Sequence, residues 1–317
     1  MAAAPTEIAI HKRKGDGSAK RMGFFTDTTT CIGCKACEVA CKQWNDLPAD
    51  DLHFGKGFSY DYTNALSAST WRHVRFVETV KPTTPPEQIS STEDLPDLVE
   101  LAAGNLASAP LGGDAGESGT QLDRWVFMSD VCKHCTNAGC LDACPTGALI
   151  RTEFETVIVQ PDICNGCGYC VPSCPFGVID RDPYDGRAAK CTLCYDRLED
   201  GLEPACAKAC PTDSIQFGEY DKLVERAHGR VLELHERGLE SAYLYGAGDD
   251  PGEQLAGNLG AFFLLTEPPE RFGLPAQADS PIQDNMPTAT AAGIAAGFTA
   301  AAVTLASFVI KHRGAQR

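Results

Sequence analysis

Sixteen cysteines constrain this chain more than any other feature, because they fall into four groups of four with none left over. The groups, numbered one to four in chain order, span residues 31–41, 132–144, 164–174 and 191–210. A spacing that recurs four times predicts one type of site built four times. Disulfides are the least favoured explanation, because a chain of 317 residues with 43% hydrophobic residues can bury a core without covalent cross-links.

The spacing inside the groups favours iron–sulfur clusters over zinc. Group three reads C-x2-C-x2-C-x3-C-P, the run of bacterial ferredoxins, in which the fourth cysteine ligates the neighbouring cluster. Group one repeats this spacing with Lys42 in place of the proline, while groups two and four lengthen one gap and end at Pro145 and Pro211. Zinc sites with four cysteines usually show two separated pairs, which groups two and four allow and groups one and three do not. The sequence therefore predicts four 4Fe–4S clusters.

Ferredoxin-type clusters come in pairs that exchange their fourth ligands. Groups two and three are adjacent and form one natural pair, which leaves groups one and four as the other. Each expected site is named after the group that supplies three of its ligands. The group-one site is Cys31, Cys34, Cys37 with Cys210; the group-two site is Cys132, Cys135, Cys140 with Cys174; the group-three site is Cys164, Cys167, Cys170 with Cys144; the group-four site is Cys191, Cys194, Cys206 with Cys41. The alternative is that each group ligates one cluster with its own four cysteines. If residues 170–174 are helical, one helix carries ligands of two clusters, because residues four apart share a helix face.

This pairing predicts an α+β fold with two ferredoxin-like 4Fe–4S lobes, one inserted within the other. The expected parts are an N-terminal extension at 1–21, a first lobe at 22–80 and 175–220, a loop excursion at 81–123, a second lobe at 124–174 and a C-terminal extension at 221–285. The excursion is rich in Pro, Ser, Gly, Thr and acidic residues, which is typical of surface loops. Apolar and β-branched patterns predict strands at 71–80, 147–150, 156–159 and 177–179, a helix at 220–237 and a core segment at 259–265.

The end of the chain predicts a single transmembrane helix at 286–310, followed by a cytoplasmic tail at 311–317. Residues 287–310 carry no charge, and this length can cross a bilayer core of about 30 Å. A buried or flexible alanine-rich tail is the alternative. Lysine and arginine follow the segment while acidic residues precede it, so the positive-inside rule places the C-terminus in the cytoplasm and the clusters on the extracytoplasmic side of the cell membrane.

The remaining residues indicate no catalytic chemistry. The sequence shows no Ser-His-Asp set, P-loop or paired-carboxylate signature, and every cysteine is used as a ligand. His134 is expected at the surface or in a hydrogen bond, and not as a ligand. Lysines near the groups are expected to be solvated, with an effect on cluster potentials as the alternative; they are Lys35, Lys42, Lys133, Lys190 and Lys208. The net charge of -16 argues against nucleic acid as a partner.

Three stretches, residues 22–45, 133–149 and 191–218, closely resemble the iron–sulfur (beta) subunit of respiratory formate dehydrogenases. The resemblance implies that the sixteen cysteines match the ligands of that family position by position. It also implies a non-catalytic role, in which electrons pass from a catalytic alpha subunit with a molybdenum or tungsten pterin cofactor to a cytochrome b-type gamma subunit in the membrane and then to quinone. The four-cluster pattern alone is shared with subunits of nitrate, dimethyl sulfoxide and polysulfide reductases, which stay open as the alternative.

Overall fold

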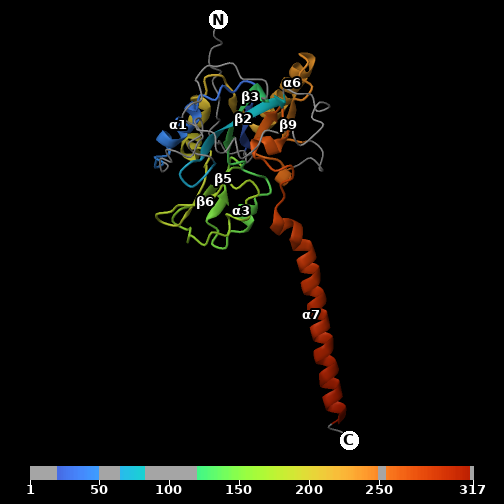
Figure 1. Ribbon diagram of the computed structural model, residues 1–317. Helices are drawn as coiled ribbons and strands as arrows, with labels where there is room; N and C mark the ends of the chain where they lie inside the picture. The colour runs from blue at the N-terminus through green and yellow to red at the C-terminus, as the bar shows by residue number, and fades with distance from the viewer. Residues whose placement is uncertain (1–19, 50–64, 83–119, 249–254, 315–317) are drawn as a thin grey trace, which may run out of the picture. The chain divides into compact units, whose positions relative to one another are not determined.

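The computed structural model describes residues 20–49, 65–82, 120–248 and 255–314 (Figure 1). Of the expected N-terminal extension only residues 20 and 21 are described. Most of the expected excursion at 81–123 also lies outside the described residues. The sixteen cysteines all lie inside them, so the sites can be followed completely.

A four-stranded sheet with the order β8-β1-β10-β9 forms the centre of the fold. Its strands are β1 (Met22–Asp27), β8 (Ile215–Glu219), β9 (Tyr243–Tyr245) and β10 (Ala261–Leu265). The strand β1 runs antiparallel to β8 and parallel to β10, with Phe25 opposite Phe262. Every residue of β1 and β10 is buried, as expected for strands covered on both faces. The core segment expected at 259–265 is therefore confirmed.

Helix α6 (Tyr220–Glu236) packs against β1, β8 and β9 and confirms the predicted helix. Its buried residues Tyr220, Leu223, Ala227 and Leu234 follow the three- and four-residue spacing of one helix face. The ring of Tyr220 meets Phe262 edge-on, with 5.6 Å between centroids. The chain from residue 220 onward thus adds two strands to the sheet that contains β1 and β8, and it adds a helix that packs against this sheet.

Short elements surround the cysteines. The helices are α1 (Ala36–Trp44), α3 (Gly139–Asp142), α4 (Tyr195–Glu199) and α5 (Ala205–Lys208), and the 3₁₀ turns are η3 (Leu255–Gly257) and η4 (Pro269–Phe272). The hairpins are β4 (Leu149–Arg151) with β5 (Val157–Val159), and β6 (Asp180–Arg181) with β7 (Ala188–Ala189). The strands expected at 147–150 and 156–159 are confirmed in part by β4 and β5. The strand expected at 177–179 is wrong, since pairing begins only at Asp180.

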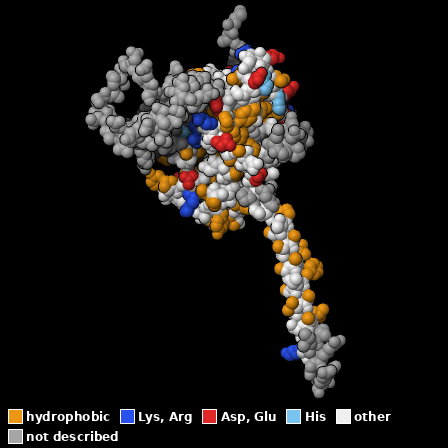
Figure 2. Space-filling view, turned by 45° about the vertical axis from the view of Figure 1, so that its right-hand side comes forward, with side chains coloured by type: hydrophobic (Ala, Val, Ile, Leu, Met, Phe, Trp, Pro, Cys, Tyr) orange, Lys and Arg blue, Asp and Glu red, His pale blue; other side chains and the backbone are white. Residues whose placement is uncertain are grey.

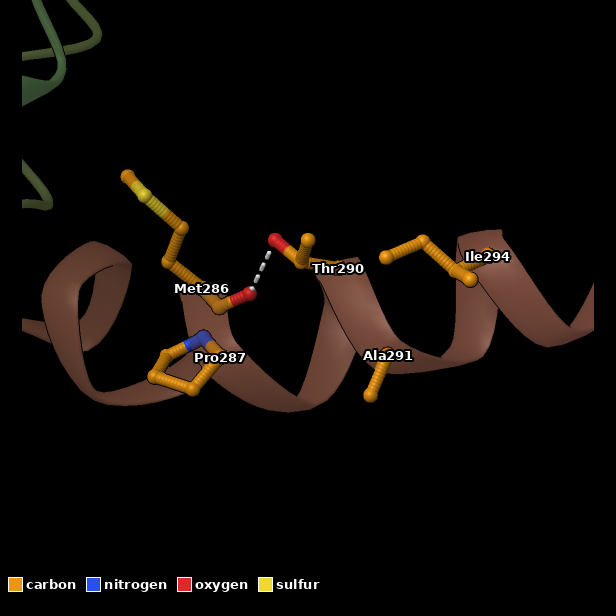
Figure 3. Close-up of a pocket in the computed structure, with 5 residues that line it drawn as sticks. All are labelled: Met286, Pro287, Thr290, Ala291 and Ile294. Carbon is orange, nitrogen blue, oxygen red and sulfur yellow. Dashed lines mark hydrogen bonds between the residues drawn. The ribbon is translucent and has the colours of Figure 1, made fainter.

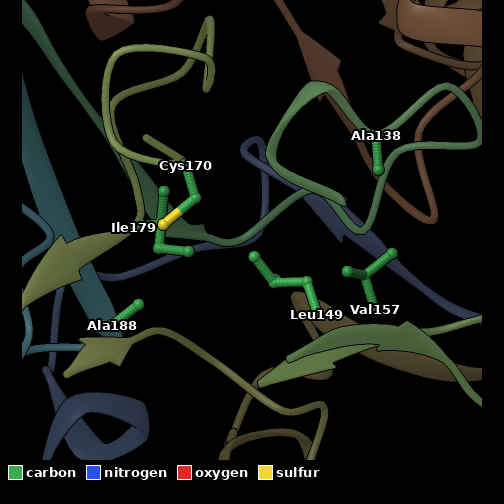
Figure 4. Packing of buried hydrophobic residues seen from close by; sticks show 6 residues of the cluster. All are labelled: Ala138, Leu149, Val157, Cys170, Ile179 and Ala188. Carbon is green, nitrogen blue, oxygen red and sulfur yellow. The ribbon is translucent and has the colours of Figure 1, made fainter. Parts of the chain in front are cut away.

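A small core lies among the cysteines of groups two and three (Figure 4). Leu149, Val157 and Ile179 pack there with Cys170, and Cys135, Cys140 and Cys164 are among the partly buried residues against it. The two short hairpins contribute Leu149, Val157 and Ala188 to this core. They place aliphatic groups around sulfur atoms, which lowers the local polarity of these sites.

Residues 76–126 form a second compact unit. Within the described residues it holds parts of β2 (Arg72–Pro82) and β3 (Thr120–Val131), which pair as a two-stranded sheet. The strand expected at 71–80 is confirmed by β2.

The C-terminal helix α7 (Pro281–Gly314) contains a segment, Asn285–Phe308, that is long and apolar enough to span a membrane. None of this segment is buried in the described part of the protein, and apolar side chains lie along it in Figure 2. In Figure 3 the hydroxyl of Thr290 points to the Met286 carbonyl oxygen, to which it donates at 2.7 Å. Thr299, Thr304 and Ser307 bond backbone carbonyls in the same way. These four hydroxyls therefore need no water.

Candidate iron–sulfur centres

All sixteen cysteines carry free thiols, so the disulfide explanation is excluded. They differ in exposure: Cys34 of group one and Cys167 of group three are exposed, whereas group four holds three buried thiols. Helix α1, which carries Cys37 and Cys41, packs against α5, which carries Cys206. Groups one and four are therefore neighbours in space although about 150 residues separate them along the chain.

One backbone feature repeats in all four groups. The residue just before the second cysteine has a positive φ: 67° at Gly33, 44° at His134, 72° at Gly166 and 59° at Leu193. A left-handed residue turns the chain sharply, and glycine adopts this conformation most easily. Four loops with different sequences thus share one turn, which supports the inference of four sites of one type.

Gly166 allows a test of this turn, because a Cβ at this position would lie 2.7 Å from the carbonyl oxygen of Gly186. Gly147 has a similar φ of 69° with nothing near its Cβ position. Alanine in the left-handed region costs about 1–2 kcal/mol at either position, but only Gly166→Ala adds a steric clash. We expect Gly166→Ala to lower the temperature at which visible cluster absorbance is lost by clearly more than Gly147→Ala. Equal losses in the two variants would show that the close approach of Gly186 does not matter.

The group-one site is a cavity lined by four cysteines. Cys31, Cys34 and Cys37 line it together with Cys210 of group four, and Ser129 lies beside them. Burial, and then the neighbouring thiols of Cys210 and Cys34, raise the pKa of Cys31. The structure thus brings together the four residues expected at this site.

The fourth cysteine of group one lies beside group four. Burial raises the pKa of Cys41, and the nearby thiols of Cys206 and Cys194 raise it further. Cys191, fully buried, has Cys41, Cys194 and Cys206 among its electrostatic neighbours, together with Cys132 of group two. Cys41 is therefore near all three other residues expected at the group-four site.

Groups two and three show the same arrangement of neighbouring thiols. Burial raises the pKa of Cys135, and the further causes include Cys132, Cys140 and also Cys174 of group three. These residues are the expected group-two site.

The reciprocal neighbour is Cys144 of group two. Burial raises the pKa of Cys170 to about 11, with Cys144, Cys164 and Cys167 adding to the effect. Residues 170–174 form turns and not the helix considered from sequence, so the two ligands share a tight loop.

Donors to sulfur also repeat between groups. Two Cys-Pro-Thr segments place a threonine hydroxyl near the fourth thiol, at 3.6 Å for Cys144 and Thr146 and at 3.8 Å for Cys210 and Thr212. Backbone amides point at sulfur as well, from Ala188 to Cys164 at 3.4 Å and from Leu193 to Cys191 at 3.3 Å. Hydrogen bonds of this type stabilise thiolates and tune bound clusters.

Two lysines near the ligands are buried, which corrects the expectation that they are solvated. Lys133 and Lys190 are only 1% and 2% exposed, whereas Lys208 is exposed. Lys133 is paired with the Asp130 carboxylate. Burial alone would lower the pKa of Lys190, but the nearby thiolates of Cys132, Cys140 and Cys191 outweigh burial and raise it. Lys190 therefore stays charged.

Sequence reasoning missed Arg72, which is 1% exposed. Its guanidinium donates to the Cys206 sulfur at 3.1 Å and to the Ser129 carbonyl at 3.2 Å, and it lies 4.8 Å from the Phe24 ring centroid. The only signal was an arginine in a strand pattern that otherwise places apolar residues inward.

His134 is buried and accepts a hydrogen bond at Nδ1 from the Val157 amide at 3.1 Å. Burial, and then the charge of Lys190, hold the pKa of His134 well below its usual value, so the ring is neutral. The hydrogen-bonding interpretation is confirmed, and the surface one is wrong.

The donor set fits clusters better than single ions. Among the described residues no three side chains of His, Cys, Asp or Glu converge closely enough to bind one metal ion. Sulfur ligands of zinc lie about 3.8 Å apart, given a Zn–S bond of about 2.3 Å. Four cysteines instead surround a cavity at the group-one site, as a larger cubane requires.

Comparisons with known proteins agree with this chemistry. Two models of a 4Fe–4S dicluster domain match residues 30–148 and 123–220, which together hold all sixteen cysteines.

Relatives with known names cover most of the chain. The formate dehydrogenase-O iron–sulfur subunit of Escherichia coli (strain K12) is 40% identical over 227 residues, 71% of this chain and 62% of that protein. The formate dehydrogenase iron–sulfur subunit of Haemophilus influenzae is 39% identical over 71% of this chain and 59% of its own length. The B subunit of the anaerobic dimethyl sulfoxide reductase of E. coli is 30% identical over 66% of this chain and 78% of its own length.

The match thus spans less than two thirds of the formate dehydrogenase subunits. The cysteine groups, the 4Fe–4S dicluster domains and these identities lead to one conclusion: the chain belongs to the family of 4Fe–4S iron–sulfur subunits that includes those of formate dehydrogenases and the B subunit of dimethyl sulfoxide reductase.

Proposed function

We propose that this chain is the electron-transfer subunit of a formate dehydrogenase complex and performs no bond-breaking chemistry itself. The observation that carries the proposal concerns the fourth cysteine of each group. It lies beside thiols of another cysteine group, as in paired ferredoxin-type clusters. When bound, 4Fe–4S clusters supply one-electron redox chemistry, while the protein positions and insulates them.

The proposed ligand sets are the four cross-ligated sites. Support comes from the cavity that joins Cys210 to group one and from the neighbours of Cys41, Cys174 and Cys144. They favour cross-ligation over one group for each cluster. We retain the two-lobe division, with 22–80 and 175–220 around groups one and four and 124–174 around groups two and three. The strands β9 and β10 extend the first lobe.

The four sites form a row. Exchange of fourth ligands joins the group-one site to the group-four site, and the group-two site to the group-three site. The two pairs meet where Cys191 neighbours Cys132. The order is then one, four, two, three, and the exposed thiols Cys34 and Cys167 belong to the two end sites. Each end site thus has one exposed ligand that a partner could reach, whereas no ligand of the two middle sites is exposed.

The group-three end faces the membrane in this proposal. Helix α3, which carries Cys140, packs against α7, and the Ser280 hydroxyl donates to Asp142 at 3.1 Å. The pair of groups two and three therefore lies beside the start of the anchor. The group-one end is left for a catalytic alpha subunit with a molybdenum or tungsten pterin, and the group-three end for a cytochrome b-type gamma subunit that reduces quinone.

The segment Asn285–Phe308 is the proposed single-pass anchor. At about 1.5 Å per residue its 24 residues extend about 36 Å, enough for a bilayer core of about 30 Å. The internal bonds of its hydroxyls suit a medium without water. The charges flanking the segment support a cytoplasmic C-terminus and an extracytoplasmic globular part.

A second candidate is the same role in another molybdopterin oxidoreductase. The match to the B subunit of dimethyl sulfoxide reductase favours it, because that protein is covered over 78% of its length. The higher identity to formate dehydrogenase subunits favours the first candidate.

The test is anaerobic purification of the chain with its partner subunits, followed by metal analysis and electron paramagnetic resonance (EPR). We expect about sixteen iron and sixteen sulfide per chain and signals of interacting clusters, which appear on addition of formate. Zinc in place of iron would refute the electron-transfer role. Reduced clusters that dimethyl sulfoxide oxidises, but that formate cannot reduce, would favour the second candidate.

A further inference from the structure

Lys190 lies at the junction between the two pairs of sites. Its ammonium donates to the carbonyl oxygens of Val157 and Cys191, the latter at 3.0 Å. Its electrostatic neighbours are Cys132 and Cys140 of the group-two site and Cys191 of the group-four site. One buried positive charge therefore faces ligands of both middle sites.

Arg72 is a second buried cation beside the group-four site. Its guanidinium bonds the Cys206 sulfur, and Cys37 and Cys191 are among its electrostatic neighbours. Ser129 accepts from Arg72 at 3.3 Å and lies 3.2 Å from the Cys37 sulfur. Lys190 and Arg72 are thus both buried cations beside ligands of the group-four site.

Lys190 and Arg72 differ from Lys133, another buried cation near the ligands. Asp130 neutralises the charge of Lys133. Among the described residues, neither Lys190 nor Arg72 has a carboxylate partner. An unpaired buried charge is costly unless another charge compensates it. The negative charge at the middle sites is the compensating charge that the structure offers.

Burial and charge act in opposite directions on a cluster. Four thiolates make a bound cluster anionic, and reduction adds one negative charge, so burial disfavours the reduced state. The middle sites have the more buried ligands and would be hardest to reduce without compensation. We propose that Lys190 and Arg72 raise the reduction potentials of the clusters at the group-four and group-two sites, so that an interior cluster is reduced before either end cluster. This inference rests on the proposed electron-transfer function and deepens it.

The test is an EPR-monitored redox titration of the purified complex carrying Lys190→Met, which removes the charge and keeps the side-chain length. The interaction energy of two unit charges about 10 Å apart, at an effective dielectric constant of about 20, changes an equilibrium constant by more than a factor of about ten. We therefore expect the midpoint of one interior cluster to fall by at least about 59 mV, the equivalent of a tenfold change for one electron. Lys190→Arg keeps the positive charge, so we expect this variant to keep the midpoint of the unmodified complex.

Lys208→Met is the matched control, because Lys208 also lies within two residues of a ligand in sequence but is exposed to solvent. We expect it to leave all midpoints nearly unchanged, since water screens exposed charges. An unchanged midpoint in Lys190→Met, or equal shifts in the two methionine variants, would overturn the proposal.

A second measurement leaves the ligands of the two middle sites unchanged. It tests the proposal if the Lys190→Met complex does not assemble. Cys34→Ser and Cys167→Ser each perturb one end site. Both should leave unchanged the signal that appears at the highest potential, and a change of that signal in either variant would overturn the proposal. These titrations use dithionite and dye mediators.

Failure of this inference can be told apart from failure of the proposed function. A complex that formate cannot reduce, but that shows the midpoint shift in Lys190→Met, would disprove only the assignment to a formate dehydrogenase complex.

Discussion

Replacement of Cys174 by alanine is expected to disrupt the cluster at the group-two site and to leave the group-three cluster in place. Cys174 belongs to group three in sequence, but its thiol is an electrostatic neighbour of Cys135 and Cys140 in group two. Loss of one thiolate removes a ligand from one cubane only. The iron content should fall from about sixteen toward about twelve per chain.

Double variants identify which site is lost. If Cys174 and Cys135 hold the same cluster, Cys174→Ala combined with Cys135→Ala should lose no more iron than the more damaging single variant. Cys174→Ala combined with Cys164→Ala should lose two clusters and retain about eight iron atoms. This logic is that of a double-mutant cycle, in which residues of one unit do not act additively. The reverse pattern would establish one group for each cluster.

Deletion of residues 286–317 is expected to release the chain from membranes when it is expressed without partner subunits. The deletion removes nearly all of the apolar segment Asn285–Phe308, none of which is buried in the described part of the protein. The described contacts of Ser280 and all sixteen cysteines lie before the cut, so the iron content should not change. Membrane fractionation with iron analysis checks both expectations. Truncated chain that still sediments with membranes would contradict the anchor.

A point substitution gives a finer version of the same test. Phe298→Arg places a charge near the centre of the segment, where insertion costs about 2.5–3.5 kcal/mol. Leu232→Arg on α6 is the matched control, because Leu232 is also an exposed apolar side chain but lies outside the segment. Only Phe298→Arg should increase the soluble fraction. Equal behaviour of the two variants would argue against insertion.

Features that depend on neighbouring residues were predictable from the sequence. The cysteine groups, α6, β2 and the apolar part of α7 each follow from a spacing within one short segment. The fold around them was not predictable in the same way. The parallel pairing of β1 with β10 joins distant segments, and no local pattern indicates which strand will lie beside β1.

The sites show the same division. Residue type and spacing were enough to predict every cysteine as a ligand, because few other side chains can hold such a cluster. The burial of Lys190 and Arg72 was not visible, since a charged residue is normally expected at the surface and only the thiols around these two make burial favourable. The turn at residues 170–174 was also missed, because helical spacing and a tight loop both bring residues four apart together.

The pairing of β1 with β10 has a consequence for how the protein is made. The Thr28 hydroxyl, just after β1, donates to the Leu264 carbonyl, 236 positions along the chain, and every cysteine is encoded between them. The ribosome therefore releases all sixteen ligands before the strand that completes the sheet core is available. Contacts so distant form late. Iron and sulfide can thus reach loops of an unfinished nascent chain, and the arrival of β10 closes the sheet afterwards.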